Sequence, residues 1–242
     1  MPLGFSTGAI FRKIPSISKK IINVCREIGC NAIELSAMTA NEVEFFDNLI
    51  KSSERLSDFK YISMHSPGIG VIYKKDTRTR EILNKLEKAY VHFDCSSLVV
   101  HPALVEDWSV FDDFSFNLAI ENMSKDVPFY LPEQLKEIFK KDKNYSMTLD
   151  VKHAFESNSG RKDLPAELYE AFEDKIVEIH LSGYNPNAKK HEHKPLIVTN
   201  HPEIVNFVKD KQHIPIIIES DCEDVEQMKA EFEYIKKILV LS

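Results

Sequence analysis

The sequence lacks any apolar run that approaches the roughly 20 residues needed to span a bilayer, so we expect no contact with a membrane. It also lacks a secretory signal, because its first residues already have the pattern of a strand, and we therefore expect a cytoplasmic protein. An excess of cations is missing as well: 31 lysine and arginine residues stand against 38 aspartate and glutamate residues, for a net charge of −7. This balance weighs modestly against nucleic acid as a partner, although a local cluster of cations can override the overall sign.

Cysteine is scarce, and its positions are Cys25, Cys30, Cys95 and Cys222. Their spacing does not match the paired knuckles of a cysteine zinc site, and most of them fall in segments with helical patterns. We therefore expect free thiols and not disulfides. Any metal site must use other side chains.

Eight short runs of β-branched and aliphatic residues, each bounded by turn residues, predict strands. They are Leu3–Ser6, Ala32–Leu35, Tyr61–His65, Leu98–His101, Leu118–Glu121, Met147–Asp150, Ile176–His180 and Ile214–Glu219. The segments between them carry apolar residues at three- and four-residue spacing, which predicts helices. Ser16 is expected to cap the first helix, Gly29 to end it, and Pro132 to stand in the first turn of a later one.

This alternation predicts an α/β protein with a single domain over residues 1–242, folded as a (β/α)8 TIM barrel. An open doubly wound sheet also alternates strand and helix, but it rarely needs eight strands of similar length with a polar tip on nearly every one.

Nine side chains of metal-ligating type stand at or just past the ends of these runs. They are His65, His101, Glu121, Asp150, His153, His180, His191, His193 and Glu219. The C-terminal ends of barrel strands meet on one face, so we expect these side chains to converge there. A single histidine at a strand end is usually an ordinary hydrogen-bonded residue, but converging carboxylates repel one another unless a cation lies among them. Imidazole and carboxylate ligands without thiolate suit zinc, manganese or iron at a hydrolytic or isomerising centre.

Two short strings add detail to this site. In HEH, His191 and His193 are two residues apart, so on an extended segment both point the same way and one ion could take both. In DVKH, Asp150 and His153 leave a strand end through a turn, which can direct them to neighbouring ions. Three other histidines are expected to be solvated: His92, His201 and His213.

Seven strings, taken in order, resemble the endonuclease IV family within the xylose-isomerase-like barrel superfamily: MHSP, VVHPA, AIEN, LDVKHAF, EIHLSG, HEHKPL and IIIES. That family cleaves DNA at abasic sites with zinc ions. The resemblance implies up to three Zn²⁺ ions, with Mn²⁺ as a possible substitute, and three ligand sets: His65, His101 and Glu121; Glu121, Asp150, His180 and Glu219; and His153, His191 and His193. It further implies that Glu121 and Glu219 take part in catalysis, with a metal-activated hydroxide attacking phosphorus.

The chain departs from the family in two places. The family has an aspartate where His191 stands, so the third ion would have an all-imidazole shell and stronger Lewis acidity. The segment ELSAMTANEVEF lacks the basic and aromatic insertion expected of a loop that wedges into a duplex, and its Glu34 resembles the isomerase and epimerase branch instead. The cations that could contact a phosphate backbone, or could simply be solvated, are Lys189, Lys190, Lys194, Arg161 and Lys162.

Three functions therefore remain open. The first is a metal-dependent phosphoester hydrolase, whose substrate could be abasic DNA. The second is a sugar or sugar-phosphate isomerase or epimerase, in which one divalent ion polarises a carbonyl and a carboxylate moves a proton. The third is a non-catalytic metal-binding or docking barrel, which explains the ligands but not an open rim. The number of ligands favours the first.

Overall fold

Eight parallel strands close into a barrel in this computed structural model, which describes residues 1–157, 163–186 and 192–240. Each strand pairs with the next along the chain, and β8 pairs with β1. The strands are β1 (Leu3–Ser6), β2 (Ala32–Ser36), β3 (Tyr61–His65), β4 (Leu98–Val100), β5 (Leu118–Glu121), β6 (Ser146–Asp150), β7 (Ile176–Leu181) and β8 (Ile216–Ile218). The predicted (β/α)8 TIM barrel is confirmed.

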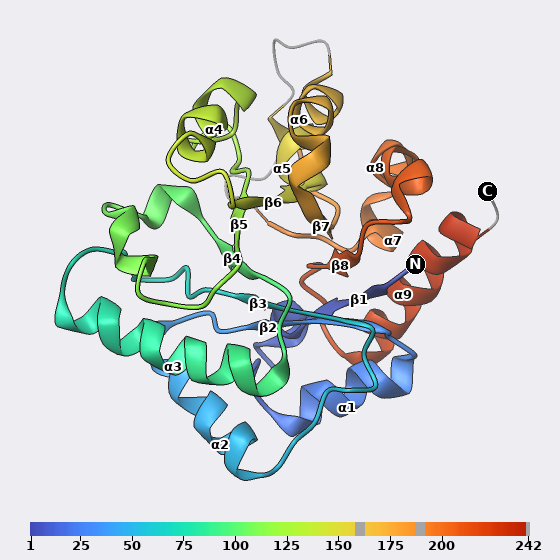
Figure 1. Cartoon of the computed structure of the whole chain (residues 1–242). Helices are drawn as coiled ribbons and strands as arrows, with labels where there is room; N and C mark the ends of the chain where they lie inside the picture. The colour runs from blue at the N-terminus through green and yellow to red at the C-terminus, as the bar shows by residue number, and fades with distance from the viewer. Residues whose placement is uncertain (158–162, 187–191, 241–242) are drawn as a thin grey trace.

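Helices surround the barrel on its outside (Figure 1). They are α1 (Lys19–Ile28), α2 (Phe45–Lys51), α3 (Thr77–Phe93), α4 (Pro132–Phe139), α5 (Val151–Glu156), α6 (Leu164–Phe172), α7 (Leu196–Thr199), α8 (Pro202–Val208) and α9 (Val225–Val240). Short 3-10 helices join some of them: η1 (Thr7–Ile10), η2 (Ala40–Glu44), η3 (Pro102–Leu104), η4 (Trp108–Phe111), η5 (Glu173–Lys175) and η6 (Lys209–Lys211). Among the described residues, none of these helices has both the length and the apolar character needed to cross a membrane.

The predicted helix signals hold in part. Gly29 ends α1 in the left-handed conformation with φ 92°, and Pro132 stands in the first turn of α4. The predicted cap is wrong: the side chain of Ser18, not Ser16, accepts a hydrogen bond from the backbone of Ile21 at the start of α1. Ser16 instead donates to a carboxylate oxygen of Glu42 at 2.9 Å, because the helix begins two residues later than its apolar pattern.

Side chains alternate between the inside of the barrel and the layer beneath the helices. Phe5 of β1 faces outward and packs its ring 6.3 Å from that of Phe232 on α9. Gly4, one residue earlier, faces inward, and a Cβ there would lie 1.7 Å from the backbone oxygen of Ala32. Glycine therefore permits β1 and β2 to approach each other at this point. Glu34 lies on the same inner face, in register with Ser63 of β3.

Two predicted strands are longer than the observed ones. β4 ends at Val100, so His101 follows the strand, and β8 spans Ile216–Ile218, so Glu219 follows it directly. Both side chains still leave the backbone at the C-terminal rim. All four cysteines are free and buried, as expected.

Candidate metal centre

Eight of the nine predicted ligands lie on the C-terminal rim of the barrel, within the described part of the chain. The described residues form four groups of potential metal ligands, and one of these, Glu34, Glu178 and His180, lies below the rim. The other three groups overlap and contain the eight predicted residues. These groups are His65, His101 and Glu121; Glu121, Asp150, His180 and Glu219; and Asp150, His153 and His193. His191 lies outside the described residues. The first two groups coincide with the predicted sets, and in the third the carboxylate of Asp150 stands beside the two imidazoles.

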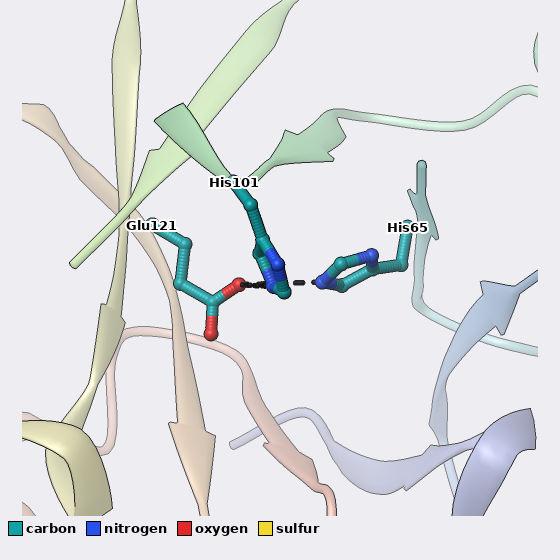
Figure 2. A group of neighbouring side chains, drawn as sticks. All are labelled: His65, His101 and Glu121. Atoms are coloured by element: carbon teal, nitrogen blue, oxygen red, sulfur yellow. Dashed lines mark hydrogen bonds and ion pairs between the residues drawn. The ribbon is translucent and has the colours of Figure 1, made fainter. Parts of the chain in front are cut away.

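Glu121, the last residue of β5, is the hub of this arrangement. One carboxylate oxygen, Oε2, lies 2.9 Å from His101 Nε2 and 3.2 Å from His65 Nε2 (Figure 2). The other, Oε1, lies 3.5 Å from His180 Nδ1. Burial raises the pKa of Glu121, but the surrounding imidazoles, with His101 first, outweigh it and hold the pKa well below its ordinary value. The carboxylate is therefore ionised and faces two ligand groups at once.

His65 presents a defined ring nitrogen to this hub. Its Nδ1 lies 2.8 Å from the backbone oxygen of Ser66, which can only accept, so Nδ1 carries the proton and donates. Nε2 is then the nitrogen directed at Glu121. Burial lowers the pKa of His65, but the bond to Glu121 and the nearby charge of Glu34 raise it to about 10. Without a metal ion this histidine is protonated at neutral pH.

The central group combines Glu121 with one side chain from each of the next three strand ends. His180 Nδ1 lies 3.2 Å from Glu219 Oε2. Burial raises the pKa of Glu219, but the charge of His180 lowers it to about 2. Asp150 differs, because its burial and the charges of Glu121 and Glu219 raise its pKa well above the ordinary value.

Asn122 fixes Asp150 from the neighbouring strand end. Its side chain accepts from the Asp150 backbone N–H at 2.8 Å and donates to the Asp150 backbone oxygen at 2.9 Å. Asp150 Oδ1 accepts from the His153 backbone N–H at 2.6 Å and so caps α5. Its other oxygen, Oδ2, is left to face the ligand groups.

Three buried atoms of the central group have no hydrogen-bond partner among the described residues: Glu121 Oε1, Asp150 Oδ2 and His180 Nδ1. A buried polar atom without a partner is costly unless something satisfies it. Together with Glu219, these residues offer ligand atoms within 4.8 Å of one another. A divalent cation would satisfy all three orphaned atoms, so the donor set fits a metal ion.

The third group contains His153 of α5 and His193 of the segment before α7. Their rings meet edge to face with centroids 5.3 Å apart. His153 Nδ1 donates to the backbone oxygen of Asn122 at 3.0 Å, which leaves Nε2 as its ligand atom. Burial and the charge of Lys152 lower the pKa of His153 to about 4 and that of His193 to about 3. Both imidazoles are therefore neutral at pH 7 and can ligate a metal without losing a proton.

Backbone contacts hold His193 in place. Its backbone oxygen accepts from Asp221 at 2.7 Å, and its Nδ1 lies 3.0 Å from Ser182 Oγ. Just beyond it, the buried carboxylate of Glu231 on α9 accepts from the backbone of Leu196 and Ile197 and from the Ser220 hydroxyl. We call this arrangement the Glu231 clamp. It ties the segment that carries His193 to the residue that follows Glu219.

A cavity of about 340 Å³ opens over the ligand groups. Its lining combines ligand residues with apolar side chains that include Met38, Ile69, Met123 and Val127. Ile69 is 58% exposed. The described residues that line the cavity include no lysine or arginine.

The structure describes one of the five predicted phosphate-contacting cations, and that one does not line the cavity. It is Lys194, which pairs with Glu192 at 3.0 Å. The other four lie outside the described residues: Lys189, Lys190, Arg161 and Lys162. His201, expected to be solvated, instead stacks on Tyr184 with ring centroids 4.4 Å apart.

Glu34 and Glu178 form a polar layer below the ligand groups that the strand pattern did not predict as a unit. Both are fully buried, and neither lines the cavity. Each has a carboxylate oxygen 3.2 Å from His180 Nε2. Burial raises the pKa of Glu34, against the lowering effect of the His180 charge. One signal was available: Glu178 stands two residues before His180 on β7 and so shares its face.

No protein-family model matches the sequence, and a search of curated proteins also finds no match. The structure is similar to several solved structures. A D-tagatose 3-epimerase-like protein has a TM-score of 0.71 at 20% identity, covering 100% of this chain and 98% of its own. Endonuclease IV from Thermus thermophilus has a TM-score of 0.65 at 14% identity, covering 92% of this chain and 94% of its own. D-psicose 3-epimerase from Clostridium cellulolyticum has a TM-score of 0.65 at 10% identity, covering 99% of each chain.

These similarities support the TIM barrel as the fold. The neighbours carry names from different reaction classes, so the fold alone accommodates both endonuclease IV and sugar epimerases.

Proposed function

We propose that this protein is a metal-dependent phosphoester hydrolase with a centre of more than one metal ion. The observation that carries the proposal is the joining of three ligand groups through two carboxylates, with Glu121 in the first and second groups and Asp150 in the second and third. An enzyme that polarises one carbonyl needs one ion. Shared carboxylates between adjacent groups are what a cluster of ions requires, because each bridge neutralises charge on two cations.

The residues of this chain divide the work between them. Zn²⁺ is the proposed ion, with Mn²⁺ as the substitute that accepts the same ligands. When bound, such ions supply a nucleophile at neutral pH and neutralise charge on a phosphoryl group. Glu121 and Glu219 would hold the ions, and Glu121 would be shared between two of them. His153 and His193, neutral at pH 7, hold another ion on the side of the cavity near Ser182.

The cavity wall bears on the choice of substrate. Among the described residues the lining has no lysine or arginine, so in that part of the cavity metal ions would supply the positive charge that holds a phosphate. The apolar wall made by Met38, Ile69, Met123 and Val127 can pack against a sugar or base. An abasic site in DNA presents a phosphodiester next to a sugar that has lost its base. It is the substrate that we propose to test first.

A sugar epimerase or isomerase is the second candidate. The group Glu121, Asp150, His180 and Glu219 is complete by itself, with carboxylates that could hold one ion and move a proton. A cavity of about 340 Å³ also accommodates a monosaccharide. The structures named as epimerases that resemble this chain support the same reading.

Metal content and turnover together distinguish the two. Protein purified without chelator should contain close to three zinc ions and should hydrolyse bis(p-nitrophenyl) phosphate and cleave a duplex with one abasic site. A metal content near one, with epimerisation of a ketohexose and no phosphodiester cleavage, would replace the hydrolase with the epimerase. If the abasic duplex is the substrate, its affinity should fall steeply with salt, since phosphate contacts release counterions.

A further inference from the structure

The two ring nitrogens of His180 face two different pairs of carboxylates. Nδ1 lies 3.2 Å from Glu219 and 3.5 Å from Glu121, on the side of the ligand groups. Nε2 lies 3.2 Å from Glu34 Oε2 and 3.2 Å from Glu178 Oε1, on the side away from the cavity. His180, Glu34 and Glu178 are all fully buried.

This geometry assigns the ring nitrogens. A histidine that ligates a metal through Nδ1 must keep its lone pair there, so its remaining proton is on Nε2. That proton is donated to Glu178 Oε1 at 3.2 Å, and Glu34 Oε2 lies at the same distance from Nε2 as an ion-pair partner. Such a carboxylate behind a ligating imidazole fixes the orientation of the ring and raises its basicity.

The surroundings of Glu34 offer its carboxylate few polar partners besides His180. Among the described residues, neither of its oxygens forms a hydrogen bond, and His180 is its ion-pair partner. Glu178 has further contacts: its Oε1 accepts a hydrogen bond of 3.3 Å from the Thr148 hydroxyl, and the hydroxyl of Tyr61 interacts with its carboxylate. Burying a carboxylate costs several kcal/mol unless it is paired. The position of Glu34 in the barrel core therefore indicates that its carboxylate has a function.

We infer that Glu34 and Glu178 are positioning residues that hold the His180 ring with Nδ1 directed into the metal centre and strengthen it as a ligand. The inference rests on the proposed metal centre and not on the identity of the substrate. It also changes the expectation for Glu34, which does not line the cavity and so acts through His180 and not on the substrate itself.

The test is a Co²⁺ titration of the metal-free protein, followed by its visible absorption, for wild type, Glu34→Gln and Glu178→Gln. Both substitutions keep the side-chain volume and remove the charge behind the ring. We expect one of the bound ions to lose about 10- to 100-fold in affinity and its absorption bands to shift, because loss of an outer-shell partner has effects of this size. The remaining ions should bind as in the wild type.

Two controls separate positioning from folding. Leu83 on α3 is fully buried and is not in any ligand group, so Leu83→Ala should lower the thermal midpoint and leave the Co²⁺ affinities and spectrum unchanged. Metal-free Glu34→Gln removes one partner of the buried ion pair with His180 and so should also lower the thermal midpoint; unlike Leu83→Ala, it should in addition change the Co²⁺ affinity and spectrum.

Three results would overturn the inference, and they are distinguishable. Wild-type protein that binds no Co²⁺ would remove the metal centre itself, and with it the role of His180. Glu34→Gln and Glu178→Gln proteins that bind every ion with wild-type affinity and spectrum would remove the positioning role alone. A fourth ion in the wild type that disappears in Glu34→Gln would show that Glu34 and Glu178 ligate a metal directly.

Discussion

Glu121→Gln is the most direct perturbation of the proposed centre, because Glu121 belongs to two ligand groups. The substitution keeps the shape of the side chain but removes one negative charge and can place an amide donor near His101 and His65, 2.9 and 3.2 Å from the present oxygen. Removing one partner of a buried charge pair typically costs about 3–5 kcal/mol. At 1.4 kcal/mol per factor of ten, we expect metal affinity to fall by about two to four powers of ten in each of the two groups that contain Glu121.

The assay is metal content by elemental analysis after dialysis, together with zinc affinity from competition with a chromophoric chelator. Glu121→Gln should lose two of its ions and all measurable phosphodiesterase activity. The matched control is Asp221→Asn, which removes the same charge from the cavity wall at a residue outside the ligand groups. Its metal content should match the wild type. A Glu121→Gln protein that keeps every ion at wild-type affinity would refute the bridging role.

Three further expectations follow from the same geometry. Metal binding at pH 7 should release more than one proton, because Asp150, His180 and His65 have raised pKa values, that of His65 being about 10, and must lose protons to ligate. Calorimetry in buffers of different ionisation enthalpy measures this release. A binding enthalpy that does not depend on the buffer would contradict it. Affinity should accordingly rise with pH up to about 10. Glu231→Ala should lower the free energy of unfolding in urea by about 2–4 kcal/mol, since it leaves buried donors of the Glu231 clamp unpaired. Glu231→Gln should lower this free energy by less. Equal urea midpoints for wild type and Glu231→Ala would argue against the clamp. Lys152→Met should raise the low pKa values of the neighbouring histidines in the metal-free protein, because a buried cation disfavours their protonation; an NMR titration that shows no change would contradict this.

The fold and the first ligand groups could be predicted because their signals are local. A run such as Tyr61–His65 shows its strand and its polar tip in five consecutive letters, and a barrel brings all such tips to one face. That is why His65, Glu121 and Asp150 were identified without any knowledge of pairing. The predicted cap at Ser16 failed for a related reason, since either serine has the chemistry of a cap and only the backbone decides between them.

The role of Asp150 could not be predicted, because it depends on which of its oxygens is free. Capping of α5 uses Oδ1, and the Asn122 amide fixes the backbone on both sides. The resemblance placed Asp150 in one ligand set, but in the structure Asp150 belongs to two ligand groups. The string DVKH shows a carboxylate and an imidazole at a strand end, but not that the cap aims the second oxygen at two neighbouring sites.

Glu34 shows the deeper limit. Alternation along β2 places it on the inner face, but sequence alone does not say how far along the barrel axis it lies relative to His180, because register between strands is a property of pairing. If Glu34 lay at the tip of its strand, the sequence would predict that it transfers a proton on a sugar substrate. Seen with Ser63 as its neighbour on β3 and His180 Nε2 at 3.2 Å, it lies one layer below the ligands, where a carboxylate can reach the metal centre only through the imidazole. The same carboxylate could therefore act on a substrate from the strand tip or position His180 from one layer below, and its depth along the barrel axis decides between these two roles.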